Sequence, residues 1–217
     1  MDFGESELKT ALTIAPYLAW MGFMLVLPTA AWSYALRAAV AGVLLAAFMA
    51  VAWRRGRPSA SALAWGLGAG VLVCVLWIWP ERFDIYRRLF IISGETAGDA
   101  TPSPYDPAVC GWWLTIAKLA GSAFIIAPAE ELFFRSFLYR WIQGEGAKAD
   151  RFDLSAFLWT VALFSLEHNR WLAGAMAGAI YGIIAIRKGV ASAVVAHVVT
   201  NFALGCYVIL RGDWAFW

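Results

Sequence analysis

Hydrophobic positions run along this chain in long blocks that short polar segments interrupt. A helix needs about 20 apolar residues to cross the hydrocarbon core of a bilayer. On that scale the pattern predicts seven helices, at residues 10–29, 33–53, 60–79, 112–140, 154–169, 171–186 and 189–210. The fourth is longer than a crossing requires and the fifth is short. We expect an all-α, polytopic membrane bundle of about seven (six to eight) transmembrane helices.

The one long break in this pattern is the segment 80–111. Its first part, Glu81 to Phe90, has an amphipathic pattern and is expected to lie on the membrane surface. Its proline-rich part, residues 101–107, predicts a loop.

Composition agrees with a membrane protein. Of the 217 residues, 62% are hydrophobic and only 15% are charged, whereas soluble domains carry about a quarter charged residues. The formal net charge of +2 is too small and too scattered for a nucleic-acid partner. We expect a single integral membrane domain over residues 1–217, with the lipid bilayer as its surroundings.

Lysine and arginine set the expected orientation, since cytoplasmic loops carry the excess of these residues. With a cytoplasmic N-terminus and seven crossings, the inside collects Lys9, Arg54, Arg55, Arg57, Arg140, Lys148, Arg151, Arg187 and Lys188. The outside keeps Arg82, Arg87, Arg88, Arg170 and Arg211. This distribution favours a cytoplasmic N-terminus and an external C-terminus.

Three glycines, Gly174, Gly178 and Gly182, recur at every fourth position of the sixth predicted helix. Small residues at this spacing let helix backbones approach closely in lipid. We interpret the stripe as a packing face within the bundle. A homo-oligomer formed through the same face is the alternative.

Three charges stand inside the apolar fourth helix, at Glu130, Glu131 and Arg135. Ionisable groups inside a membrane are costly and persist where they are paired or used. Glu131 and Arg135 are at i,i+4 with the acid first, the better orientation for an ion pair. Glu130 lies about 100° round the helix and is not aimed at Arg135. Glu130 is therefore the candidate functional acid.

The only two histidines, His168 and His197, also lie in apolar surroundings. His197 and Asn201 are at i,i+4 and share a helix face. Buried polar groups need partners, and these side chains with Glu130 could provide them for one another. The sequence therefore predicts one site shared by three helices.

Other polar residues are expected to have structural roles. Glu167 lies on a different face from His168 and is expected to reach water at the helix end. Arg37 and Lys118 are expected to extend toward a membrane interface. The chain contains no GxSxG and no HExxH sequence, so neither a serine hydrolase nor a zincin is supported.

The segments Glu130-Glu131-x-x-x-Arg135, Phe164-x-x-x-His168 and His197-x-x-x-Asn201 follow one another in the chain. In order and residue type they resemble the three motifs of the CAAX-protease and bacteriocin-processing (CPBP, or Abi) family of intramembrane proteases. Type II CAAX prenyl endopeptidases are its best-known members. The resemblance covers about residues 112–205. The sequence is also similar to the CAAX-protease-related proteins of bacterial exosortase systems, which implies a bacterial inner-membrane location.

The resemblance implies an endopeptidase acting on a membrane-associated protein or peptide, whether prenylated, lipid-anchored or neither. Glu130 is the natural base for activating water, and His168 can share that water and protonate the leaving amine. The resemblance implies that His197 and Asn201 donate to the oxyanion. Glu131 and Arg135 would support Glu130, and no cofactor is required.

Three alternatives remain open from the sequence. Glu130, His168 and His197 could instead bind a catalytic zinc, which accepts two histidines and one carboxylate. The protein could also be a catalytically silent scaffold or immunity protein, or a proton or ion carrier.

Counted at 1.5 Å per residue, Glu130 falls in the cytoplasmic half of its helix and His168 near the outer side. The two can meet only if both helices extend beyond the bilayer.

Overall fold

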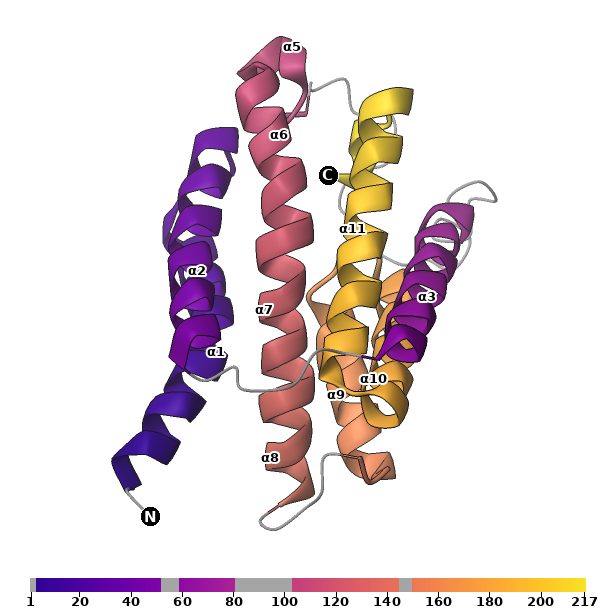
Figure 1. The fold of residues 1–217 in the computed structure, drawn as a ribbon. Helices are drawn as coiled ribbons and strands as arrows, with labels where there is room; N and C mark the ends of the chain where they lie inside the picture. The colour runs from indigo at the N-terminus through magenta and orange to yellow at the C-terminus, as the bar shows by residue number, and fades with distance from the viewer. Residues whose placement is uncertain (1–2, 52–58, 81–102, 145–149) are drawn as a thin grey trace.

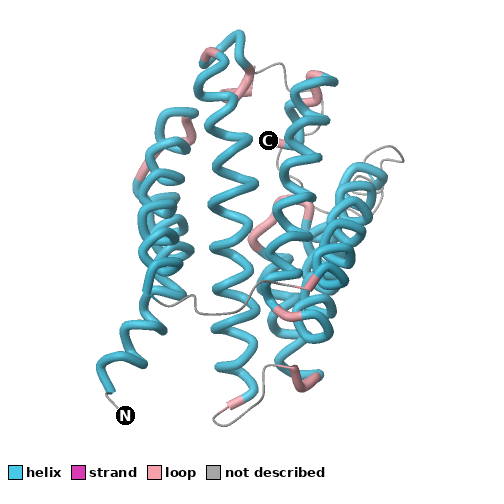
Figure 2. Tube along the Cα trace, in the orientation of Figure 1, coloured by secondary structure: helices cyan, strands magenta, loops and turns pink. Residues whose placement is uncertain are grey.

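The structure is a computed structural model that describes residues 3–51, 59–80, 103–144 and 150–217, and within these ranges it contains helices and no strand (Figure 2). This confirms the all-α prediction. The first three helices are α1 (Phe3–Val26), α2 (Ala31–Val51) and α3 (Ala60–Ile78). The predicted surface segment Glu81 to Phe90 lies outside the described residues.

A short helix, α5 (Pro107–Cys110), leads into one long helical run. This run consists of α6 (Trp112–Gly121), η2 (Ser122–Ile126), α7 (Ala127–Glu131), η3 (Leu132–Leu138) and α8 (Tyr139–Gln143). The chain ends with α9 (Leu154–Leu166), α10 (Trp171–Lys188), α11 (Val190–Arg211) and the 3-10 turn η4 (Trp214–Phe216).

All seven predicted apolar blocks form helices in the described part of the chain. Five are long and apolar enough to cross a membrane: Glu7–Val26, Ala31–Val51, Ala60–Ile78, Trp112–Gln143 and Val190–Arg211. α9 has only 13 residues, and α10, which carries the glycine stripe and two terminal cations, is not among the five. Among the described residues, five helices are therefore long and apolar enough for a full crossing, within the all-α membrane bundle that the sequence predicts.

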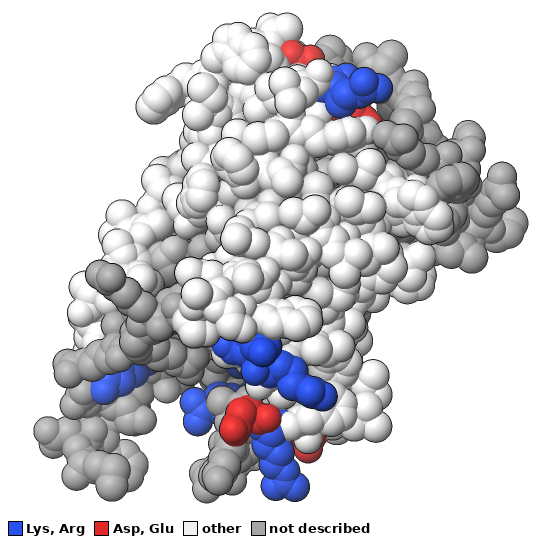
Figure 3. All heavy atoms as spheres, turned by 45° about the vertical axis from the view of Figure 1, so that its right-hand side comes forward, with Lys and Arg blue, Asp and Glu red and all other residues white. Residues whose placement is uncertain are grey.

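The surface of the bundle has the distribution that a bilayer favours. Large hydrophobic side chains are exposed on the outer faces of its helices, among them Leu25, Val43, Trp65 and Leu158. On the face in Figure 3, Lys, Arg, Asp and Glu gather at the two ends and leave an uncharged zone between them. An exposed apolar surface of this extent fits lipid rather than water. The protein is an integral membrane protein by this evidence.

The long run from α6 to α8 forms a central column, with α1 and α2 on one side and α3, α9, α10 and α11 on the other (Figure 1). α11 contacts both this column and α3. On α3, a Cβ atom added at Gly70 would stand 2.5 Å from the carbonyl oxygen of Ala196 on α11. Glycine is thus required for the close approach of these two helices.

The glycine stripe of α10 packs against α9 within the chain. A Cβ atom at Gly178 would stand 3.1 Å from the ring of Phe164, and one at Gly182 would stand 3.0 Å from that of Phe157. At Gly174, it would come within 3.3 Å of the His168 side chain. The packing interpretation is confirmed, while a homo-oligomer remains a prediction.

The central column is wound more loosely on either side of the acidic pair. The π-helical segments η2 and η3 flank α7, which begins with Ala127 and Pro128. Proline has no N–H, so the carbonyl one turn earlier has no helical partner. Wide turns of this kind frequently occur at functional sites. Here they set the direction in which Glu130 and Glu131 leave the helix.

Candidate active site

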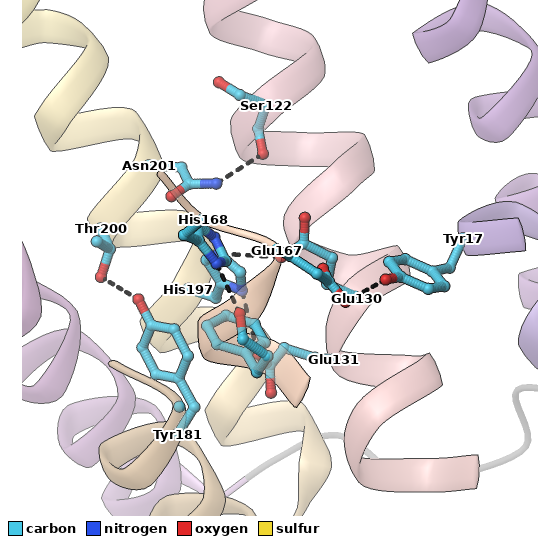
Figure 4. A network of polar contacts seen from close by, with 12 residues as sticks. Tyr17, Ser122, Glu130, Glu131, Glu167, His168, Tyr181, His197, Thr200 and Asn201 are labelled. Atoms are coloured by element: carbon cyan, nitrogen blue, oxygen red, sulfur yellow. Dashed lines mark hydrogen bonds and ion pairs between the residues drawn. The ribbon is translucent and has the colours of Figure 1, made fainter. Parts of the chain in front are cut away.

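One cavity gathers the residues that the sequence singled out. It has a volume of about 290 Å³ and lies between α1, α2, α3, the central column, α10 and α11. Its walls include Glu130, His168, His197 and Asn201. The predicted shared site is thus present as one space (Figure 4), although these four side chains come from distant parts of the chain.

The pair Glu131 and Arg135 forms the base of the site. Arg135 Nε lies 3.3 Å from Glu131 Oε2, and both residues are buried, Glu131 at 0% exposed and Arg135 at 4%. Arg135 Nη2 also donates to the carbonyl of Gly178 at 3.2 Å, and its guanidinium lies 5.0 Å from the Phe164 ring centroid. The predicted ion pair is confirmed.

His197 connects the two glutamates, which the sequence did not indicate. Its Nδ1 donates to Glu131 Oε1 at 3.1 Å, and its Nε2 lies 3.7 Å from Glu130 Oε2. The imidazole is stacked on the Tyr181 ring at a centroid distance of 4.7 Å. A carboxylate on Nδ1 fixes the ring orientation and directs Nε2 toward the cavity.

His168 reaches the same cavity from the turn after α9. Its Nδ1 lies 2.8 Å from the carbonyl of Phe164. Because a carbonyl can only accept, Nδ1 carries the proton and Nε2 of the neutral ring is an acceptor. The Trp77 ring packs against the imidazole edge to face, with centroids 5.2 Å apart. Trp77 therefore lines the site.

The sequence placed Glu130 and His168 at different depths in the membrane, and the short length of α9 explains how they meet. Helix α9 ends at Leu166 and is about 20 Å long at 1.5 Å per residue, which is too short to cross about 30 Å of hydrocarbon. The turn that follows lies beside α7, so His168 and Glu130 line one cavity.

Asn201 lies one helical turn beyond His197 on α11. Its Nδ2 donates to the carbonyl of Ser122 at 3.1 Å, in the π-helical segment η2. Behind it, the Tyr181 hydroxyl donates to Thr200 Oγ1 at 2.7 Å, and Thr200 donates to the carbonyl of Gly70 at 2.9 Å. These bonds fix α11 against the central column, α10 and α3.

The expectation for Glu167 is wrong. Instead of extending to water at a helix end, it lines the cavity with Glu130 and accepts a hydrogen bond from the Tyr17 hydroxyl. The cavity therefore contains two carboxylates (Figure 4). Glu130 Oε2 is buried and has no hydrogen-bond partner among the described residues, so one carboxylate oxygen is available to a bound molecule.

The expectation for Lys118 and Arg37 is also wrong. Lys118 lines the cavity, with Nζ 4.1 Å from the Tyr34 ring centroid and 4.6 Å from that of Tyr105. Arg37 is 6% exposed and stands over the Trp20 ring. Both side chains turn inward onto aromatic faces, which attract a cation, and do not extend away from the bundle.

A metal does not fit the described residues as they lie. Catalytic zinc takes three protein ligands, and no group of three His, Cys, Asp or Glu side chains in the described ranges has the geometry to hold one. Glu130, His168 and His197 are therefore not arranged as a zinc site in this structure.

One family model matches part of this chain. Residues 112–203 match the family model described as Type II CAAX prenyl endopeptidase Rce1-like. This segment contains all four cavity residues of the prediction together with the Glu131–Arg135 pair, and the match supports a protease. Neither the curated proteins nor the solved structures contain a match to this chain. The narrower resemblance to exosortase-system proteins is not confirmed.

Proposed function

We propose that this chain is an intramembrane endopeptidase that hydrolyses a peptide bond of a membrane-associated protein or peptide. The observation that carries the proposal is the single cavity that holds Glu130, His168, His197 and Asn201. An acid, a histidine with a free nitrogen and two further polar side chains inside an apolar bundle are costly, and hydrolysis gives each of them a role.

In the proposed reaction, water binds between the free oxygen of Glu130 and Nε2 of His168. Glu130 takes one proton as the water oxygen attacks the carbonyl carbon of the substrate. Asn201 donates to the oxyanion that forms through its second amide hydrogen, and His197 donates through Nε2 when both of its ring nitrogens carry protons. Such donors are each worth about 10²–10³ in kcat. Glu130 passes this proton to Nε2 of His168, which gives it to the leaving nitrogen as the C–N bond breaks, so that both residues return to their starting forms. The products are a carboxylic acid and an amine.

The Glu131–Arg135 pair supports this chemistry without touching the substrate. Glu131 accepts from His197 Nδ1 and so holds Nε2 toward Glu130. Arg135 balances the charge of Glu131 at 3.3 Å. Removal of Glu131 would therefore release His197, and loss of Arg135 would leave a buried carboxylate without its cation.

The cellular membrane and the orientation of the protein in it are also part of the proposal. We propose a bacterial inner-membrane protein with a cytoplasmic N-terminus. The first turn of α1 and the C-terminal end of α11 lie at opposite ends of the bundle in Figure 1, which agrees with the proposed external C-terminus. Labelling of a cysteine introduced at Asp213 in intact cells tests this orientation, and protection from an impermeant reagent would contradict it.

The decisive experiment compares variants on a peptide library. Purified protein in micelles is incubated with fluorogenic peptides, and cleavage is read by mass spectrometry. Glu130→Gln and His168→Ala are each expected to lower kcat by at least about a hundredfold. Asp150→Asn, which removes an exposed carboxylate outside the cavity, is expected to leave kcat unchanged. Unchanged cleavage in both cavity variants would contradict the proposal.

The same assay separates the remaining alternatives. If activity is lost with 1,10-phenanthroline and restored by zinc, the metal mechanism replaces the glutamate mechanism. A scaffold or immunity protein would show no cleavage, and its biological effect would survive Glu130→Gln. An ion carrier would produce flux in liposomes, which an endopeptidase does not.

A further inference from the structure

The segment after α11 folds back over the cavity. Helix α11 ends at Arg211, and Gly212 follows with φ at +66°, a left-handed conformation that glycine adopts without steric cost. Residues 213–217, the C-terminal turn, then return toward the space between α6 and α11, where the chain end is marked in Figure 1. Phe216 and Trp217 belong to the walls of the cavity. Part of the proposed active site is therefore closed by this turn.

Backbone hydrogen bonds join the C-terminal turn only to the end of α11, as far as the described residues extend. The N–H of Asp213 donates to the carbonyl of Val208 at 3.2 Å, while Phe216 and Trp217 donate to carbonyls inside the turn. Its hold on the rest of the bundle comes from side-chain contacts. The turn can therefore swing away without breaking the hydrogen bonds of a neighbouring helix, and residues at the ends of elements commonly serve as hinges.

Aromatic rings hold the C-terminal turn in its closed position. The Arg170 guanidinium stands 4.4 Å from the Phe216 ring centroid, and the Tyr207 ring packs edge to face on the same ring at 5.9 Å. The Trp217 ring packs edge to face on Tyr105, with centroids 6.4 Å apart. A single contact of these kinds changes an equilibrium by only about two- to tenfold, so several weak contacts together keep the turn closed.

Arg170 connects the C-terminal turn to the segment that presents His168. It lies two residues after His168, at the start of α10, and its guanidinium reaches across to Phe216. The turn itself follows α11, the helix that carries Asn201. The contact between Arg170 and Phe216 therefore joins two walls of the cavity that come from different parts of the chain.

The closed cavity is too small for the reaction that we propose. Its volume of about 290 Å³ is at the small end of ligand pockets, whereas an endopeptidase must hold residues on both sides of the scissile bond. Most of its other walls belong to long helices. Phe216 and Trp217 line the cavity and are also partly exposed. The C-terminal turn is therefore the wall that can move with the least disruption of the bundle.

We propose that the C-terminal turn is a lid on the active-site cavity, with Gly212 as its hinge and Arg170 as its latch. In the closed position, Phe216 and Trp217 restrict the entry of a peptide. Release of Arg170 from the Phe216 ring lets the turn swing outward and enlarges the cavity beside Asn201. The need for this opening rests on the proposed function. A lid of this kind keeps other chains and bulk water away from the catalytic groups until a substrate binds.

The access of a reagent to the cavity tests the lid without any need for turnover. In full-length protein whose three cysteines are replaced by alanine, Leu204→Cys places one thiol on the cavity wall. Its alkylation by a charged, water-soluble maleimide in micelles is followed by mass spectrometry. Arg170→Gln should raise the rate about two- to fivefold, as befits one cation–π contact. Phe216→Ala combined with Trp217→Ala should raise it by about tenfold or more.

Lys188→Gln is the matched control for Arg170→Gln, because Lys188 also stands over an aromatic ring, that of Trp65, but lies outside the cavity. It should leave the alkylation rate unchanged. A thiol at Val73, which is 1% exposed and is not a wall of the cavity, should stay unreactive as long as the bundle is folded. Phe216→Leu keeps an apolar side chain and removes only the aromatic face, so it provides a milder variant. An equal rate at Leu204→Cys with and without these lid changes overturns the proposal.

A cross-link distinguishes the lid from the proposed function. In the cysteine-free protein, Tyr105→Cys and Trp217→Cys are joined by a bis-methanethiosulfonate, which should abolish peptide cleavage until dithiothreitol releases it. Cleavage at the full rate by the cross-linked protein overturns the lid. If reagent access depends on Arg170 and Phe216 but wild-type protein cleaves no peptide, the lid stands and the endopeptidase proposal fails. If peptides are cleaved and access is the same in every variant, the endopeptidase stands and the lid is overturned.

Discussion

Replacing Arg135 by methionine is expected to destabilise the bundle strongly. Glu131 is 0% exposed, and Arg135 lies 3.3 Å from its carboxylate. Breaking a buried ion pair by removing one partner costs about 3–5 kcal/mol, because it leaves an uncompensated charge. His197 still donates to Glu131 at 3.1 Å, so we expect the lower end of this range, about 3 kcal/mol. That corresponds to more than a hundredfold change in the unfolding equilibrium.

Removing both charges should cost far less than removing one. In the double variant Glu131→Gln with Arg135→Met, no buried charge remains unpaired, and the glutamine can still accept from His197. We expect its stability to lie within about 1 kcal/mol of wild type, since neutral replacement of a buried ion pair is often tolerated. The two single changes and the double change form a mutant cycle with a coupling energy of about 2 kcal/mol or more.

The measurement is unfolding in mixed micelles with increasing dodecyl sulfate, followed by circular dichroism. Arg140→Met is the matched control, because Arg140 is exposed on the same helical run and exposed substitutions usually change stability by less than about 0.5 kcal/mol. The reasoning would be refuted if Arg135→Met cost no more than Arg140→Met, or if the two changes at the pair were simply additive.

Three further predictions follow from contacts in the described residues. Gly70→Ala should destabilise the protein by about 1–3 kcal/mol in the same unfolding assay, since its Cβ would stand 2.5 Å from a carbonyl oxygen of α11. Gly68→Ala should leave stability unchanged, because a Cβ atom there would have no neighbouring atom within 4 Å. Tyr17→Phe removes the hydrogen bond to Glu167 and should cost about 1.5–3 kcal/mol, the range for a bond to a charged group. A chemical-denaturation midpoint equal to that of wild type would count against it. Asn201→Leu should lower kcat about 10²–10³-fold on a cleaved peptide with little change in KM, and a change in KM alone would show that it binds substrate without donating to the oxyanion.

The sequence was sufficient for those parts of the site that follow from helical geometry. The pairing of Glu131 with Arg135 depends only on their i,i+4 spacing, and the common face of His197 and Asn201 follows from the same rule. These relations are local, so helical periodicity determines them. The apolar block lengths likewise predicted where the helices lie.

Relations between helices could not be obtained in this way. The bridge from His197 to both Glu130 and Glu131 depends on how α11 packs against the central column, which no spacing within one helix encodes. Glu167 was misplaced because α9 ends three residues earlier than its apolar block suggests. The inward direction of Lys118 depends on two tyrosine rings from other parts of the chain. A charged residue in an apolar block without a local partner was the available signal.

The shortness of α9 also has a consequence for how the protein is made. A helix of 13 residues followed by a turn containing Glu167 and His168 cannot stand alone in lipid, because its polar turn would face hydrocarbon without partners. One of those partners, the Tyr17 hydroxyl that donates to Glu167, belongs to α1, which precedes α9 in the chain. We therefore expect the α9–α10 hairpin to enter the membrane as a unit against helices that are already in place. The active site would then be complete only when α11, which carries His197 and Asn201, has packed against this hairpin.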